Sequence, residues 1–137
     1  MKIAFATQDK VHVDAHFGWA KAIMTYEISA QGHQLVDVLE FNGKLEEDGD
    51  EDKLTPKLEA IHDCAILYVS AIGGSAAARV VASKIHPVKV AQVESIAALL
   101  DKLQVVLQGT PPPWLRKVLS RDGERRFDFE DEEVPHG

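Results

Sequence analysis

The sequence is poor in cysteine, and it lacks the long apolar runs that membranes require. Cys64 is the single cysteine among 137 residues, so neither an intrachain disulfide nor a four-cysteine zinc or iron–sulfur site can form. No apolar run approaches the roughly 20 residues of a membrane span, and the opening residues MKIAFATQDK lack the apolar region of a signal peptide. We therefore predict a soluble cytoplasmic protein. Any iron–sulfur species that it binds must use other ligands or arrive already assembled.

Basic residues are in the minority, but the acidity is confined to two segments. Residues 44–53 hold six acids and two lysines, and residues 122–133 hold seven acids and two arginines. These segments contribute −4 and −5 to the net charge of −7, so the rest of the chain carries +2. A nucleic-acid-binding protein would show a concentrated basic face, which this pattern does not provide. We predict two solvated acidic patches on a mildly basic body that is compatible with a small anionic ligand.

The apolar pattern favours one α/β domain. Residues 64–72 form a nearly continuous apolar run, which is typical of a strand buried on both faces. The full expected order is strand 2–7, a hairpin of strands 22–28 and 33–41, a helix from 55 to about 62, strand 64–72, a helix from 75 that ends before His86-Pro87, strand 88–93 and a helix with Ile96, Leu99, Leu100 and Leu103 on one face. Because three strands precede the alternating part, we expect a mixed sheet with flanking helices.

The character of the chain changes after residue 108, so we expect a domain over residues 1–108 and a tail over residues 109–137. The sequence GTPPP at 109–113 predicts a stiff linker. The sequence WLRKVL at 114–119 predicts one or two helical turns that dock back on the domain or meet a partner. The remainder is acidic and polar, and we expect it to be mobile.

The segment HVDAHFGW at 12–19 gathers two histidines, an acid and two aromatic residues around Gly18, just after the first expected strand. Imidazole is a good ligand for iron, zinc or copper, and a glycine lets a bulky ligand approach the backbone closely. His16 is the first candidate ligand and His12 the second, although a spacing of four carries little information in a loop. Phe17 and the following tryptophan would shield such a site from water. The alternative is a turn in which Phe17 packs inward and the histidines lie at the surface.

A second candidate site is Gly73-Gly74-Ser75, which follows one expected strand and opens the next helix. Free N–H groups at a helix N-terminus bind anions, and ligands gather at the carboxyl ends of parallel strands. The alternative is a tight turn with small residues for packing, because the pattern is neither a dinucleotide-binding fingerprint nor a P-loop. Cys64, at the start of the buried run, is either a small core residue or a thiolate ligand that faces a cleft.

Three segments together resemble one known family, namely IAFAT…HVDAHFGWA, AIGGSAAARVV and IHPVKV. In order and spacing, residues 1–108 resemble the NifX-like family of dinitrogenase iron–molybdenum cofactor biosynthesis proteins. The additional segment PPPWLRKVL resembles the NifX-type members more than the minimal domain of the family. The resemblance implies a ribonuclease H-like α/β fold.

The resemblance also implies a non-enzymatic carrier. Such proteins hold iron–sulfur precursors of the nitrogenase cofactor and pass them to the assembly scaffold, with other maturation proteins as further partners. The histidine thought to bind the cluster maps onto His16. We expect the N–H groups of residues 74–76 and the charge of Arg79 to help hold an anionic cluster. This requires the HFG loop (residues 16–18) and the GGS turn (residues 73–75) to share one end of the sheet.

Two other classes of function stay open at this point. A nuclease with a ribonuclease H-like fold needs several carboxylates that converge on two metal ions. Asp9 and Glu27 are the candidate pair, without a convincing wider set. A protein-interaction or regulatory module of nitrogenase maturation would instead act through the Trp114 segment and the acidic patches, without any bound cluster.

Overall fold

The protein forms a mixed five-stranded β-sheet in a computed structural model, which describes residues 1–41 and 54–133. The strand order is β4-β3-β1-β5-β6. The strands are β1 Lys2–Thr7, β3 Ala22–Ser29, β4 Gly32–Glu40, β5 Ile66–Val69 and β6 His86–Lys89. Strand β1 pairs antiparallel with β3 and parallel with β5, and β5 pairs parallel with β6. The predicted α/β class and mixed sheet are therefore confirmed.

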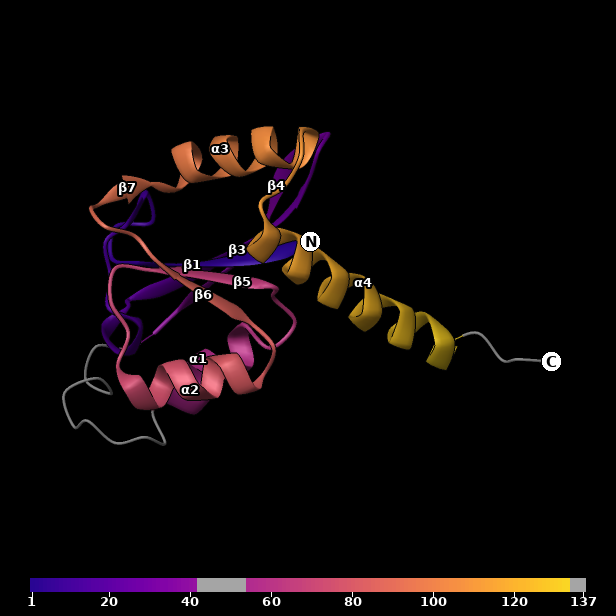
Figure 1. The fold of residues 1–137 in the computed structure, drawn as a ribbon. Coiled ribbons are helices and arrows are strands. Elements are labelled where there is room, and N and C mark those ends of the chain that lie inside the picture. The colour runs from indigo at the N-terminus through magenta and orange to yellow at the C-terminus, as the bar shows by residue number, and fades with distance from the viewer. Residues whose placement is uncertain (42–53, 134–137) are drawn as a thin grey trace.

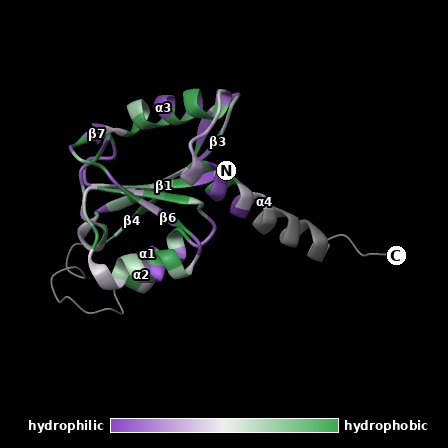
Figure 2. Ribbon diagram, in the orientation of Figure 1, coloured by the Kyte–Doolittle hydropathy of each residue, from purple (hydrophilic) through white to green (hydrophobic). Residues whose placement is uncertain are grey.

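Helices cover both faces of the sheet, as Figure 1 shows. Helices α1 Leu54–Ala60 and α2 Gly74–Ala82 lie on one face. Helix α3 Ile96–Gln108 and the first turns of α4 Pro113–Glu133 pack on the other. Strand side chains alternate between these layers, since Ile3 and Phe5 join the core under α3, whereas Ala4 and Ala6 join the core under α1 and α2. The hydropathy colours of Figure 2 show mostly apolar residues along β1 and both apolar and polar residues along α3.

The apolar run 64–72 and the helical spacing after residue 95 both form the type of element that the sequence predicts. All four residues of β5 are buried, as expected for a central strand. Helix α3 buries its expected apolar face, and its start is fixed by Ser95, whose side chain accepts a hydrogen bond of 3.0 Å from the Ala98 N–H. None of the described helices is both long enough and apolar enough to cross a membrane.

The strand after α2 begins earlier than predicted. The expected strand 88–93 is instead β6, which spans His86–Lys89. Lys84 ends the helical region with a φ of 64°, so the chain is already extended when it reaches His86. Pro87 is compatible with a strand here because β6 lies at the edge of the sheet, where a missing N–H costs no ladder bond. The central strand is also shorter than the predicted range 64–72, because the ladder ends at Val69.

A β-bulge explains why the second half of the hairpin showed no clean alternation. Thr25 pairs with Asp37 and Tyr26 pairs with Leu35, so Val36 is an extra residue in β4. An extra residue reverses the alternation of side chains between the two faces. Strand β4 is also an edge strand, and most of its residues are exposed.

The C-terminal segment differs most from its prediction. Helix α4 runs over 21 residues, not one or two turns, and it extends away from the sheet in Figure 1. Leu115 and Val118 are buried in the same core cluster as Ile3 and Phe5. The ring of Trp114 stacks on His86, with centroids 4.9 Å apart. The division at residue 108 stays a prediction, but the start of α4 packs as part of the sheet's core. The predicted acidic loop 44–53 lies outside the described residues.

Candidate functional site

The HFG loop and the GGS turn meet at the carboxyl ends of β1 and β5. The Ser70 N–H donates a 3.0 Å hydrogen bond to the Ala15 carbonyl, and the Phe17 N–H donates a 2.9 Å bond to the Ala71 carbonyl. His16 thereby forms a parallel bridge with Ala71, two residues before Gly73. The two candidate motifs share one end of the sheet, as the combined site requires. This is also the end at which ligands bind in open α/β sheets.

The segment that precedes η1 is more regular than an irregular loop, because it contains the strand β2 and the His16–Ala71 bridge. His12 and Val13 form the short strand β2 (His12–Val13), which pairs with β7 (Glu94–Ser95). Burial alternates along the segment. The residues at 13, 15 and 17 are buried, whereas those at 12, 14 and 16 are partly exposed. In an extended chain, residues of the same parity face the same side. His12, Asp14 and His16 therefore face outward together, so their spacing is informative after all.

His16 stands at the start of the short 3-10 helix η1 (Phe17–Trp19) and caps it. Its Nδ1 accepts a hydrogen bond of 3.2 Å from the Gly18 N–H. An accepting Nδ1 means that the neutral ring carries its proton on Nε2. A metal needs a free lone pair on one ring nitrogen. Binding through Nδ1 displaces the Gly18 N–H, and binding through Nε2 moves the proton to Nδ1. Either route breaks the His16–Gly18 bond.

The two aromatic residues of the loop do not form a wall around the site. Phe17 is completely buried and belongs to the core cluster under α1 and α2. Its position in the alternating segment turns it inward, as the alternative interpretation of the loop had it. Only its backbone lies beside the outward-facing histidines. Trp19 has 51% of its surface exposed, so it shields little from water.

Lys57 contacts the HFG loop, although the sequence did not indicate it as a site residue. Its ammonium donates a 2.8 Å hydrogen bond to the Gly18 carbonyl and lies 5.2 Å from the ring centre of Phe41. Only 3% of its surface is exposed, although lysine is among the residues least often buried. Lys57 thus ties α1 to the HFG loop. No sequence pattern distinguishes it from a solvated helix lysine.

The GGS turn presents open backbone at the start of α2. Gly73 is the N-cap, without a side chain to bond the first helical N–H groups, and residues 73–75 are exposed. A Cβ added at Gly73 or Gly74 would meet no atom within 4 Å, so packing does not require these glycines. The N–H groups of a first helical turn are available to an anion. Arg79 lies farther along α2, and its Nη2 is 3.5 Å from the Thr55 hydroxyl of α1.

Cys64 lies at the other end of β5 and is completely buried. Six residues lie between it and Ala71, which corresponds to about 20 Å of extended chain. Cys64 therefore does not lie beside His16, and its complete burial agrees with the alternative of a small core residue. Among the described residues, no group of three or more His, Cys, Asp or Glu side chains could hold a metal ion.

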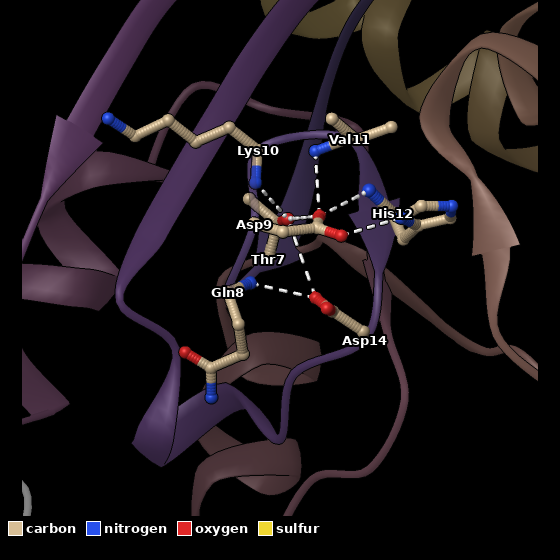
Figure 3. A network of polar contacts seen from close by, with 7 residues as sticks. All are labelled: Thr7, Gln8, Asp9, Lys10, Val11, His12 and Asp14. Carbon is tan, nitrogen blue, oxygen red and sulfur yellow. Dashed lines mark hydrogen bonds and ion pairs between the residues drawn. The ribbon is translucent and has the colours of Figure 1, made fainter.

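Asp9 organises the turn between β1 and β2, as Figure 3 shows. Its Oδ1 accepts hydrogen bonds of 2.8 Å and 2.7 Å from the N–H groups of Val11 and His12, and one of 3.3 Å from the Thr7 hydroxyl. Its Oδ2 lies 2.6 Å from the His12 Nδ1. The His12 side chain and these N–H groups hold the pKa of the Asp9 carboxyl far below its usual range. Asp14 accepts the Gln8 N–H at 2.7 Å.

The proposed nuclease pair does not converge. Glu27 stands opposite Lys2 at the amino end of β1, where it accepts a 2.7 Å hydrogen bond from the N-terminal ammonium. Asp9 follows the carboxyl end of the same six-residue strand. Six strand residues span about 20 Å, so Asp9 and Glu27 cannot share metal ions. The candidate pair therefore cannot form the shared metal site that the nuclease hypothesis requires.

The described residues thus form a three-layer α/β domain in which a histidine-bearing loop and a glycine-rich helix start meet at one end of the sheet. The family model described as "Dinitrogenase iron-molybdenum cofactor" matches residues 1–105, and the chain belongs to this family. Protein NifX of Herbaspirillum seropedicae is 61% identical over 132 residues, which are 96% of this chain and 90% of that protein. Protein NifX of Sinorhizobium fredii is 43% identical over 139 residues, which cover 97% and 87% of the two chains.

Comparison with solved structures supports the fold alone. The crystal structure of PH0822 has a TM-score of 0.61 with 20% sequence identity. The likeness covers 77% of this chain and 89% of PH0822. The description of PH0822 carries no ribonuclease H-like label, so that part of the fold assignment stays a prediction.

Proposed function

We propose that this protein takes part in the biosynthesis of the iron–molybdenum cofactor as a non-enzymatic carrier. It binds iron–sulfur precursors of the cofactor transiently and passes them to the assembly scaffold of nitrogenase maturation. Membership of the family supports the process. The observation that carries the role is the bridge between His16 and Ala71, which brings the HFG loop close to the exposed start of α2.

The chemistry of this edge suits a cargo that must be released. A sulfide-rich anionic cluster would meet one imidazole from His16 and the backbone N–H groups at the start of α2. Hydrogen bonds to charged groups contribute about 1.5–3 kcal/mol each, so a few of them give useful but reversible binding. The described residues hold no set of three clustered metal ligands that would trap the cargo. Lys57 and Arg79 add positive charge on the α1 side of the loop.

The alternative function, an interaction module without cargo, would act through the Trp114 segment and the two acidic patches. That segment packs on its own domain, because Leu115 is completely buried and Trp114 stacks on His86. It is therefore not a free peptide. We assign cargo binding to the surface around His16, at the carboxyl ends of β1 and β5.

The carrier proposal predicts stoichiometric binding of a cluster that depends on His16. We would titrate the protein anaerobically with iron–molybdenum cofactor isolated from dinitrogenase, as a stand-in for its precursors, and follow visible absorption and co-elution on gel filtration. His16→Ala should weaken binding about tenfold or more, which corresponds to about 1.4 kcal/mol. His62→Ala is the matched control, because His62 is an exposed histidine beyond the end of α1. Failure of the unaltered protein to bind would contradict the proposal.

A further inference from the structure

We propose that His12, oriented by Asp9, is a second ligand of the same cargo, so that the cluster is bound at two points along the extended segment 12–16. This inference rests on the proposed carrier function. It assigns a ligand role to one side chain and a positioning role to another.

The His12 ring is already in the form that a metal ligand needs. Its Nδ1 lies 2.6 Å from the Asp9 Oδ2. A carboxylate can only accept hydrogen bonds, so Nδ1 carries the proton, and in the neutral ring Nε2 keeps its lone pair. Figure 3 shows Nε2 pointing away from Asp9. A carboxylate behind the ring is the usual arrangement around metal-binding histidines, where it fixes both the tautomer and the ring orientation.

Asp9 is itself held firmly. Its other oxygen accepts the N–H groups of Val11 and His12 and the Thr7 hydroxyl, which come from the end of β1 and the turn that follows. The carboxylate cannot rotate away from His12 without losing these bonds. His12 is in turn fixed through its backbone, because it pairs with Ser95 of β7. The ring is therefore pre-oriented before any cargo arrives.

His12 and His16 differ in the role of Nδ1, which donates a hydrogen bond in His12 and accepts one in His16. The Nδ1 of His16 is engaged by the Gly18 N–H, and its ring must leave that bond to ligate a metal. His12 needs no such change. The structure therefore assigns His12 the first contact and His16 a second contact that opens the cap of η1.

The separation of the two histidines favours a cluster over a single ion. They face the same side of an extended segment, and four residues of extended chain place their Cα atoms about 13 Å apart. Two imidazoles at that spacing suit two different iron atoms of one multi-iron cluster. The lack of any group of three candidate ligands among the described residues also argues against a mononuclear site.

The first test needs no cargo. Nitrogen-15 spectra of the histidine side chains in the free protein report which ring nitrogen carries the proton. We expect His12 to be protonated on Nδ1 and His16 on Nε2. A His12 ring protonated on Nε2 would overturn the inference. Asp9→Asn should move the His12 proton to Nε2, because the carboxamide can turn an NH2 group toward Nδ1 while its oxygen still accepts the backbone N–H groups.

The second test is the cofactor titration with His12→Ala, Asp9→Asn and the control His62→Ala, with folding of each variant checked by its amide spectrum. Loss of a residue behind a metal-binding histidine typically lowers affinity about 10–100-fold, so we expect losses of that size for Asp9→Asn and at least as large for His12→Ala. Binding that is weakened by His16→Ala but unchanged in both of these variants overturns the second ligand and leaves the carrier proposal intact. Absence of binding by the unaltered protein overturns the carrier proposal itself.

Discussion

Replacing Phe17 by alanine is expected to lower the free energy of unfolding by about 3–5 kcal/mol. The ring is completely buried in the core cluster that joins the sheet to α1 and α2, so its removal leaves a cavity in that core. Urea denaturation followed by circular dichroism measures the loss. Phe17→Leu, which retains most of the apolar volume, should lose much less stability and keep cofactor binding.

The neighbouring Trp19→Ala variant is the matched control for Phe17, because half of the Trp19 surface is exposed. Its free energy of unfolding should change far less. A Phe17→Ala protein as stable as the original but unable to bind cofactor would show that the ring contacts cargo, as the sequence first suggested. That result would contradict the burial of Phe17 on which our assignment depends.

Leu115→Ala should lower the free energy of unfolding by about 2–5 kcal/mol, even though residue 115 lies beyond the predicted domain boundary. Leu115 is completely buried, and with Val118 it belongs to the core under α3. Lys117→Ala is the control on the exposed side of α4 and should change stability by no more than about 0.5 kcal/mol. Thermal and urea denaturation of the three proteins decide the comparison.

Equal stability of the Leu115→Ala and Lys117→Ala proteins would mean that the start of α4 does not contribute to the core. The Trp114 segment would then be available to a partner, and the interaction-module interpretation would regain its main support. The expected difference of several kcal/mol instead places α4 within the folded unit.

The sequence predicts the parts of the fold that depend on local periodicity. The apolar run of β5 and the helical spacing of α3 need no information from the rest of the chain. The predictions of secondary structure are wrong where contacts between distant parts of the chain determine the local structure. The bulge at Val36 depends on pairing with β3, and the length of α4 depends on a core that Leu115 completes. The His86-Pro87 pair correctly predicts that the preceding helix has ended. That Pro87 can lie in a strand depends on the position of β6 at the edge of the sheet, which local sequence does not indicate.

The candidate site was predictable as two motifs but not as one arrangement. The sequence indicates His16 and the glycines at 73 and 74 separately, and only the pairing with Ala71 brings them together. Cys64 begins the same apolar run that leads to the GGS turn, and the length of β5 is what separates it from His16.

Side-chain details of the site were less accessible still. Burial of the Lys57 ammonium depends on the Gly18 carbonyl, which is 39 residues distant in the chain. The tautomer of His12 depends on Asp9, whose role as an orienting carboxylate has no sequence signature of its own. Both are consequences of how the turn after β1 folds.

The most direct test of the carrier account is transfer of cargo. The protein is loaded with isolated iron–molybdenum cofactor, mixed anaerobically with cluster-free assembly scaffold, and separated from it by gel filtration, and iron is then measured in both fractions. Scaffold incubated with free cofactor serves as the control for uptake. We predict that most of the iron moves to the scaffold. We also predict that the Gly18 amide signal of the freed carrier returns to its position in the cargo-free protein, because the His16–Gly18 hydrogen bond forms again. Iron that stays with the protein, while the control scaffold takes up free cofactor, would contradict the account.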